Sequence, residues 1–264
     1  MTAEPPLILL PPSEGKAAGG TGPCWSPGTM AFDLDERRQR AMKALMQAMK
    51  WSGPRRGALL GVKGEHLVAA TEANAAVDTS ATVPAIERYT GVLYDELDAP
   101  SWSDQQRTVA QEAIVIFSGL FGVVAPADPI PDYKIKMGAA LPRLGKLSTW
   151  WRPQLTSVLA PVAAQRRVWN LLPNEHDAAW TPPSDAELAT VRFFDERPDG
   201  TLATVSHWNK LLKGALVRLL LDEPDTTPED LGGWEHPLGY QLAEIESDRS
   251  GVQVCSFVRR AEPI

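Results

Sequence analysis

Short apolar runs are the feature of this sequence that most constrains its fold. The first, at residues 6–10 (PLILL), is bounded by prolines and predicts a buried, central strand. The second, at residues 114–117 (IVIF), is mostly β-branched and ends at Ser118-Gly119, which predicts another buried strand. No apolar run approaches the roughly 20 residues that a membrane-spanning helix needs. The runs therefore predict a sheet at the core and no membrane partner.

Segments with helical periodicity separate the apolar runs. One helix is predicted at residues 33–51, with Asp33 as its N-cap and Gly53-Pro54 ending it. The basic residues of this helix, from Arg37 to Lys50, are expected to form a solvated face. The other predicted elements are helices at residues 65–76, 92–97, 104–112, 147–165, 207–221 and 228–231, and strands at 167–171, 189–194, 202–205, 240–246 and 252–259, with turns at 198–200 and 248–251.

Composition and charge limit the classes of function. The 264 residues are 44% hydrophobic and 22% charged, as in ordinary globular proteins, and no stretch has the composition of a flexible linker. We therefore expect an α+β fold in one compact domain, residues 1–264, with a mixed β-sheet surrounded by helices. The net charge of −7 argues against a protein that coats nucleic acid in general, while a local basic patch stays open.

The cysteines and histidines suggest neither a disulfide framework nor a metal site. No basic region precedes the first apolar run, so a secretory signal is not expected and the protein is predicted to be cytoplasmic. Cys24 and Cys255 are accordingly expected as reduced thiols. The histidines at positions 66, 176, 207 and 236 lack paired ligand spacing, so each is interpreted as an ordinary polar residue, and no metal or cofactor is expected.

The loop after the first predicted strand contains Ser13-Glu14-Gly15-Lys16. It matches the Ser-x-x-Lys pattern of serine acyl-transferases, but their partner motifs Ser-Asp-Asn and Lys-Thr-Gly are absent. It also lacks the leading glycine and the following Ser/Thr of a phosphate-binding Walker loop. What remains is a hydroxyl and an ammonium group at a strand end, where open α/β sheets bind ligands.

A basic stripe is predicted on the helix at residues 207–221. At 100° per residue, Lys210, Lys213, Gly214 and Arg218 fall within one sector of about 140°. A glycine inside a helix costs roughly 1 kcal/mol, which close approach of a backbone or a ligand usually offsets. Two interpretations stay open: a surface that binds phosphate or carboxylate, and a solvated cationic face with a packing glycine.

Residues 118–138 contain two glycines, Gly119 and Gly122, directly after the second predicted strand. The pattern permits a tight backbone with exposed amide groups. It fits a hairpin between helices that grips a DNA phosphate backbone, and it equally fits a structural turn.

Five motifs, taken together and in order, resemble the YaaA peroxide-stress family. They are the loop Leu9–Lys16, a Tyr-Thr-Gly at 89–91, a gapless signature from Ser118 to Gly138 that contains Asp128, Tyr133 and Lys134, the group Asn170, Leu171 and Glu175, and the pattern Lys210, Lys213, Gly214 and Arg218. The resemblance covers nearly the whole chain. It implies a compact mixed α/β fold with a positively charged cleft, and a role in limiting free iron and oxidative damage during hydrogen peroxide stress.

The resemblance also implies binding of duplex DNA through a helix-hairpin-helix-like element that would include residues 118–123. The sequence departs from the family pattern at Ala125, where an arginine is frequent, and this loss weakens the expectation of DNA binding. The residues expected to contact DNA or a smaller anion are Ser13, Lys16, Tyr89, Thr90, Ser118, Gly119, Gly122, Lys134, Asn170, Lys210, Lys213 and Arg218.

The alternative hypothesis is an enzyme that acts on a nucleotide or another phosphorylated small molecule. Glu175 or Asp128 is its candidate general acid or base, on condition that burial raises the pKa of the carboxyl group. Tyr133 or Tyr89 is expected to orient the substrate or relay a proton, and a covalent role stays open for Ser13 or Lys16, although no partner motif supports it. Glycosidic cleavage, lyase chemistry and group transfer all fit these residues.

Overall fold

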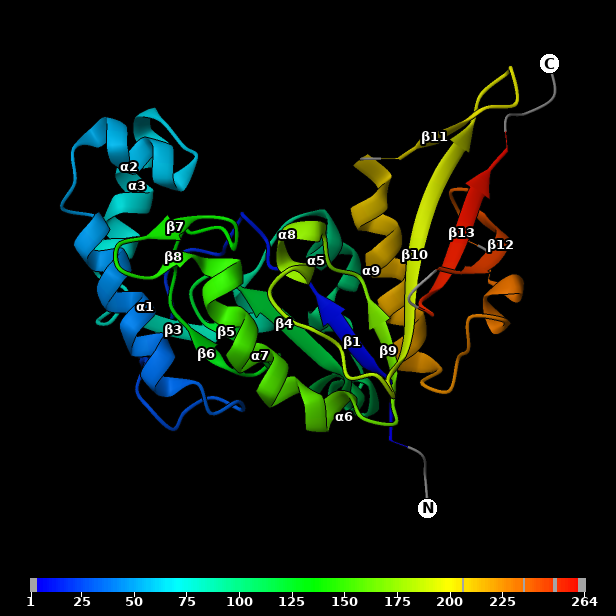
Figure 1. Cartoon of the computed structure of the whole chain (residues 1–264), viewed down its shortest axis with the longest axis horizontal. Coiled ribbons are helices and arrows are strands. Elements are labelled where there is room, and N and C mark those ends of the chain that lie inside the picture. The colour runs from blue at the N-terminus through cyan, green and yellow to red at the C-terminus, as the bar shows by residue number, and fades with distance from the viewer. Residues whose placement is uncertain (1–3, 206, 235, 249–250, 261–264) are drawn as a thin grey trace.

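The computed structural model describes residues 4–205, 207–234, 236–248 and 251–260, and it is a mixed α/β structure (Figure 1). An eight-stranded sheet runs in the order β12-β13-β10-β9-β1-β4-β5, with β11 paired to β10. Five strands run parallel to one another: β1 (Leu7–Leu10), β4 (Ile114–Ser118), β9 (Arg167–Asn170), β10 (Glu187–Glu196) and β13 (Gln253–Arg259). Three strands pair antiparallel: β5 (Gly122–Val124), β11 (Leu202–Thr204) and β12 (Gln241–Ser247).

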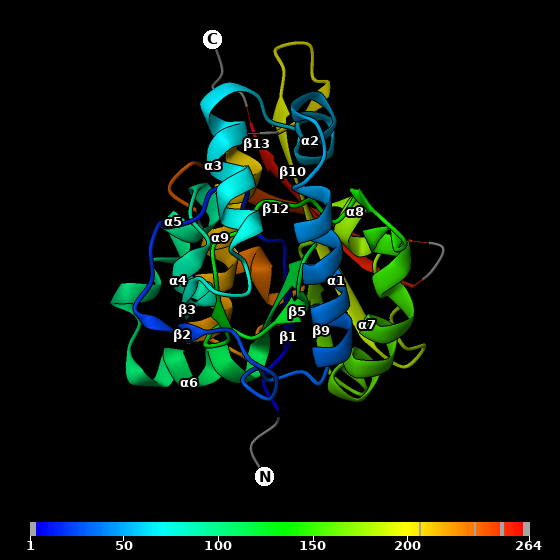
Figure 2. The same cartoon turned by 90° about the vertical axis from the view of Figure 1, so that its left-hand side faces the viewer.

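Helices cover both faces of this sheet, as Figure 2 shows with α7 on one side and α5 and α6 on the other. The helices are α1 (Asp35–Ala48), α2 (Gly53–Leu60), α3 (Gly64–Ala75), α4 (Ala85–Arg88), α5 (Val92–Leu97), α6 (Asp104–Ala113), α7 (Leu147–Ala163), α8 (Asn174–Asp177) and α9 (His207–Asp222), with 3-10 turns η1 (Ala99–Ser101) and η2 (Asp230–Gly233). Among the described residues, no helix is long and apolar enough to cross a bilayer.

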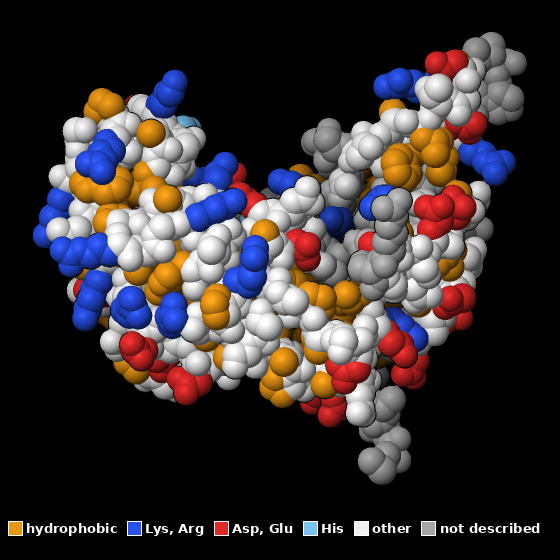
Figure 3. All heavy atoms as spheres, viewed as in Figure 1, with side chains coloured by type: hydrophobic (Ala, Val, Ile, Leu, Met, Phe, Trp, Pro, Cys, Tyr) orange, Lys and Arg blue, Asp and Glu red, His pale blue; other side chains and the backbone are white. Residues whose placement is uncertain are grey.

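The two ends of the molecule rise above its middle. The helices α1, α2 and α3 form one end and the strands β10, β11 and β13 the other, and the upper surface between them is hollowed (Figures 1 and 3). Small sheets join the helical end to the centre: β2 (Gly22–Cys24), β3 (Ala81–Pro84) and β6 (Pro129–Ile130) in one, and β7 (Ala140–Leu141) and β8 (Gly145–Lys146) in the other.

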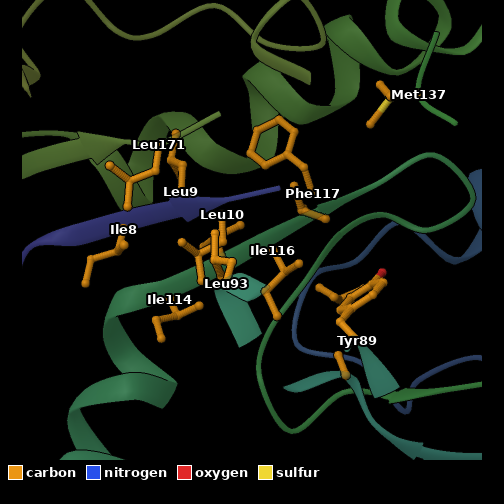
Figure 4. Packing of buried hydrophobic residues seen from close by; sticks show 14 of the residues in the cluster. Ile8, Leu9, Leu10, Tyr89, Leu93, Ile114, Ile116, Phe117, Met137 and Leu171 are labelled. Carbon is orange, nitrogen blue, oxygen red and sulfur yellow. The ribbon is translucent and has the colours of Figure 1, made fainter. Parts of the chain in front are cut away.

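The core lies around β1, whose four residues are all fully buried. Parallel strands that are covered on both faces are apolar at successive positions, and β1 follows this rule with the sequence LILL. Figure 4 shows Ile8 and Leu10 on the same side of β1 as Leu93 of α5, with Leu9 and Leu171 on the opposite side. The prediction of a central buried strand at residues 6–10 is therefore confirmed.

The predicted strands and most of the predicted helices are observed within a few residues of their expected ends. Residues 189–205 form the expected antiparallel hairpin, and β12 pairs antiparallel with β13 across a turn whose two middle residues, 249 and 250, lie outside the described part. The prediction that Gly53-Pro54 ends the first helix is wrong. The first helix ends at Ala48, and Gly53 begins α2, where a proline in the first turn is tolerated because its missing N–H has no intrahelical partner.

The expectation that Arg38 belongs to a solvated face is wrong. Its side chain is fully buried and donates to the carbonyl oxygens of Phe32, Phe121 and Val123 at 2.7–3.2 Å, and to Asp35. Burial without such partners would carry a large desolvation penalty. Arg38 therefore joins α1 to the turn between β4 and β5.

The segment of residues 118–123 is a turn between two strands. Ser118 pairs with Gly122 in an antiparallel ladder, and all six residues are buried. Gly122 has φ +75°, and a Cβ there would lie 3.0 Å from the ring of Trp151. Of the two interpretations, the structural turn is the one observed, so these residues do not form a hairpin between helices.

Candidate functional site

Two adjoining cavities lie beyond the carboxyl ends of the parallel strands β1 and β9. The smaller has a volume of about 550 Å³ and is lined by the loop at residues 11–16 and by Tyr133 to Lys136. The larger, of about 1080 Å³, is lined by the residues that follow β9 and by α9. Five residues line both cavities: Pro11, Leu93, Pro173, Glu175 and Lys210. This edge of an open sheet is where α/β proteins commonly bind ligands.

The loop that carries Lys16 is fixed to the chain before α5. Lys16 forms a β-bridge with Tyr89, and the amide of Thr90 donates to the carbonyl of Gly15. The buried guanidinium of Arg88 donates to the carbonyls of Ala17, Gly19 and Ile130. The loop is therefore anchored by backbone pairing and by one buried arginine.

The ammonium group of Lys16 lies against aromatic rings in the smaller cavity. Its Nζ is 4.3 Å from the ring centroid of Tyr133 and 5.4 Å from that of Tyr89, and it donates to the carbonyl of Ser13 at 3.0 Å. Burial lowers the pKa of Lys16 to about 8, since the opposing attraction of Asp132 is smaller. Lys16 therefore loses its proton more readily than an ordinary lysine.

Three hydroxyl groups form a chain beside Lys16. The Oη of Tyr133 is 2.7 Å from the Oγ of Ser118 and 2.8 Å from the Oη of Tyr89, and the amide of Phe121 donates to the same Oγ. Burial raises the pKa of Tyr133 to about 12 and that of Tyr89 well above its usual value. Both phenols therefore keep their protons at neutral pH and serve as hydrogen-bond donors.

Glu14 is the carboxylate of the smaller cavity that pairs with lysines. Its carboxylate oxygens lie 3.0 Å from the Nζ of Lys134 and 2.8 Å from the Nζ of Lys136. Hydrogen bonds from these two lysines lower the pKa of Glu14 to about 2. One carboxylate thus balances two ammonium groups, while Lys16 and Lys210 line the same cavity.

The larger cavity begins where β9 ends. Asn170 donates to the carboxylate of Asp177 at 2.7 Å and accepts from the amide of Leu172. Lys213 of α9 donates to the carbonyl of Leu171 at 3.0 Å, and burial lowers the pKa of Lys213 to about 8. Lys213 therefore anchors α9 to the segment after β9.

At the junction with the smaller cavity, the exposed Glu175 lies beside the buried His176, with 3.7 Å between Oε1 of the glutamate and Nδ1 of the histidine. Both ring nitrogens of His176 lack a hydrogen-bond partner in the protein, and burial lowers the pKa of His176 to about 4. His176 is therefore a neutral imidazole.

The sequence matches known proteins over most of its length. The family model described as peroxide stress protein YaaA matches residues 7–246. This chain belongs to the YaaA family. It is 37% identical to a UPF0246 protein of Streptomyces coelicolor over 251 residues, which are 93% of this chain and 94% of the relative. It is 35% identical to a UPF0246 protein of Corynebacterium glutamicum over 218 residues, 81% of this chain and 84% of the relative. The resemblance read from the five motifs is therefore confirmed.

The structure brings most of the family-motif residues together. The smaller cavity is lined by Ser13, Lys16, Thr90, Tyr133 and Lys134. Ser118 and Tyr89 support its wall through their hydrogen bonds with the hydroxyl group of Tyr133. Asn170 and Lys213 line the larger cavity, and Glu175 and Lys210 line both.

Other predicted residues lie outside the cavities. Asp128 is buried and accepts hydrogen bonds from the amides of Ala31 and Ala125, and burial raises its pKa. Arg218 is exposed and lines neither cavity. Gly119 packs on backbone: a Cβ there would lie 2.9 Å from the carbonyl oxygen of Ile135. Asp128 and Gly119 therefore serve the packing around the site.

Sequence reasoning missed His176 and Arg88 as parts of the site. His176 was interpreted as an ordinary polar residue because its spacing to other histidines fits no metal site, and within the described residues no cluster of three His, Cys, Asp or Glu side chains is placed to hold a metal ion. Its position directly after Glu175 of a family motif was the available signal. Arg88 directly precedes the Tyr-Thr-Gly motif, and its role depends on carbonyl groups remote in sequence.

Proposed function

We propose that this protein acts in the response to hydrogen peroxide by binding a small phosphorylated molecule in the smaller cavity. The observation that supports this proposal most directly is that four lysines line one cavity of about 550 Å³: Lys16, Lys134, Lys136 and Lys210. Two carboxylates, Glu14 and Glu175, line the same space, so the charged side chains sum to about +2. A phosphate group carries a charge that complements this excess.

The size and the walls of the cavity favour a small ligand over a macromolecule. Pockets for small molecules usually span about 300–1,000 Å³ and have apolar walls with a few polar groups. Here the apolar walls include Pro11, Leu93 and Ile135, and the polar groups are the lysines and the phenol of Tyr133. A nucleotide or sugar phosphate fits these dimensions, whereas a duplex is too wide to enter.

The same ligand would also meet acid–base groups. Glu175 and Lys210 line both cavities, so a ligand that extends from one to the other passes them. Tyr133 keeps its proton and donates, while Glu175 is the accessible carboxylate at the junction. Glu175 is exposed, so the burial on which its role as general acid or base was conditional is absent, and its proposed role is to accept hydrogen bonds from the ligand where the two cavities join.

Duplex DNA across the upper hollow is the second candidate. Figure 3 shows Lys and Arg side chains on the floor and along the rim of this hollow, which supports contact with a phosphate backbone. Two observations weaken it: the turn at residues 118–122 is buried and offers no exposed amides, and the net charge is −7. We therefore rank duplex DNA below the small ligand. For both ligands we propose that the protein acts in the cytoplasm.

Binding assays separate the two candidates. Thermal unfolding is followed with pyrophosphate, with ribose 5-phosphate and with a 20-base-pair duplex, for the wild type, Lys16→Gln and Lys134→Gln, and for the control Lys43→Gln on the exposed side of α1. A ligand at 100 times its Kd stabilises by about 2.7 kcal/mol, which corresponds to a Tm rise of about 5–10 °C. We expect this rise with a small phosphate, its loss in both cavity variants and its retention in the control.

Salt dependence identifies the ligand class. Duplex binding through several lysines should weaken with a log–log slope of about −0.9 per phosphate contacted. If only the duplex shifts the Tm, and the shift is equal in the wild type and Lys16→Gln, the small-molecule proposal is refuted. A steep salt slope in that case assigns the function to the second candidate.

A further inference from the structure

Lys16 differs from Lys134 and Lys136 of the smaller cavity, because no ion pair with a carboxylate is recorded for it among the described residues. Lys134 and Lys136 both pair with Glu14, whereas the described ion pairs include none that involves Lys16. The acceptor recorded for its Nζ is the carbonyl of Ser13, and the remaining contacts are ring faces of Tyr133 and Tyr89. A lysine held in this way loses a proton more easily than one in an ion pair.

The charged groups around Lys16 leave a reactive amine. Asp132 and Glu14 favour its charged form, whereas burial, Lys134 and Arg88 favour the neutral form, and the balance lowers its pKa to about 8. A neutral primary amine is a nucleophile towards carbonyl carbon. The anchored loop keeps this amine at a fixed place in the cavity wall, which reduces the entropic cost of reaction.

We propose that Lys16 forms an imine with the carbonyl group of a phosphorylated aldehyde or ketone. This inference rests on the proposed function for the phosphate, which Lys134, Lys136 and Lys210 would hold. It goes further in two ways: it specifies a carbonyl group at the end of the ligand opposite the phosphate, and it proposes a covalent bond between that group and Lys16.

The step balances without an oxidant or a further reactant. The lone pair of Nζ attacks the carbonyl carbon, the electrons of the C–O π bond move to oxygen, and a proton from nitrogen gives the carbinolamine. The hydroxyl group then leaves as water after taking a proton, while the second nitrogen proton is lost and the C=N bond forms. The protonated phenol of Tyr133 and the neutral imidazole of His176 line the same cavity as donor and acceptor for these transfers.

Lys213 provides an internal comparison. Its pKa is also lowered to about 8 by burial, but its Nζ donates to the carbonyl of Leu171, and Lys213 lines the larger cavity and not the smaller one. If a lowered pKa alone determined reactivity, the two lysines would react alike. The proposal requires that Lys16 react faster because the cavity orients the carbonyl group.

The test is reductive trapping with site mapping. The wild-type protein is incubated with glyceraldehyde 3-phosphate and borohydride, and the modified lysines are identified by peptide mass spectrometry. We expect Lys16 to be modified at least 10-fold faster than Lys213 or the exposed Lys43. Lys16→Arg should lose the fast labelling, and Lys213→Arg should keep it. Because the wild-type map reports each site directly, the result stands even where a variant folds poorly.

Three outcomes separate this inference from the proposed function. Equal labelling of Lys16, Lys213 and Lys43 refutes the proposed imine at Lys16, whether or not the cavity binds phosphate. Fast labelling of Lys16 by glyceraldehyde, at the same rate as by glyceraldehyde 3-phosphate, keeps the imine and overturns phosphate recognition. Phosphate binding in the thermal assay without trapping at Lys16 keeps the proposed function and refutes the covalent step.

Discussion

The close contact between α5 and α9 can be tested by replacing Gly214 with alanine, which adds a single methyl group. A Cβ at this position would lie 2.7 Å from the carbonyl oxygen of Leu93 and 2.8 Å from the Cβ of Glu96. Ordinary Cβ contacts begin at 3.4 Å, so the helices must separate by roughly 0.7 Å to accept alanine. The glycine of the basic stripe is therefore explained by close approach of a backbone.

Two effects of Gly214→Ala oppose each other. Alanine favours the helix by about 1 kcal/mol, and overpacking against a fixed backbone oxygen costs about 1–3 kcal/mol. Taking about 2 kcal/mol for the clash, we expect a net loss of about 1 kcal/mol of unfolding free energy. That loss corresponds to a Tm lower by about 2–4 °C.

The assay is thermal unfolding of the wild type, Gly214→Ala and the control Gly232→Ala. Gly232 lies in η2, and a Cβ there meets no heavy atom within 4 Å. The control should be neutral or more stable by up to about 1 kcal/mol. A Gly214→Ala protein that is as stable as the control or more stable would refute the close packing of α5 on α9. Since Leu93 and Lys210 of these helices line both cavities, we also expect weaker ligand binding in Gly214→Ala.

Four further predictions concern the site. Tyr133→Phe removes the hydroxyl between Ser118 and Tyr89 and should cost about 1–3 kcal/mol in urea denaturation; an unchanged midpoint would contradict the hydroxyl chain. Because its folded pKa is lowered to about 2, Glu14 should stabilise the protein above about pH 4.5 and lose this effect as the pH falls towards 2, so a pH series of Glu14→Gln and wild type should converge there. Glu14→Gln should also bind phosphate several-fold more tightly at neutral pH, measured by calorimetry. Lys213 has a lowered pKa, so the folded state binds fewer protons between pH 8 and 10.5, and the wild type should gain stability relative to Lys213→Met over that interval.

The parts of the fold that could be predicted are those determined by local pattern. The runs LILL and IVIFS are buried at every position, so their strand character and burial follow from composition alone. The strands β6, β7 and β8 have two residues each, and no local periodicity can indicate them. The burial of Arg38 could not be predicted from local sequence either, because it depends on the carbonyl groups of Phe121 and Val123, more than eighty residues away in sequence.

The candidate site divides in the same way. Lys16, Tyr133 and Lys210 were predicted because their residue types suit an anion and because family motifs contain them. The sequence did not indicate that Glu14 neutralises Lys134 and Lys136, since the pairing joins segments about 120 residues apart. It also placed Arg218 with Lys210 on one helical sector, although the cavities reach only the first half of α9. Residues in one sector of a helix point in the same direction, but the elements packed around the helix determine which of them can contact a ligand.

The long motif from Ser118 to Gly138 acts as one packing unit, which explains why it has no gap. The turn after β4 lies against the segment that forms the cavity wall: the Oγ of Ser118 contacts the phenol of Tyr133, and Gly119 leaves room for the backbone of residues 135–137. An insertion between the two halves would shift Tyr133 relative to Ser118. The glycines of this motif therefore hold the aromatic face beneath Lys16, and the chemistry we propose there depends on a turn that contacts no ligand itself.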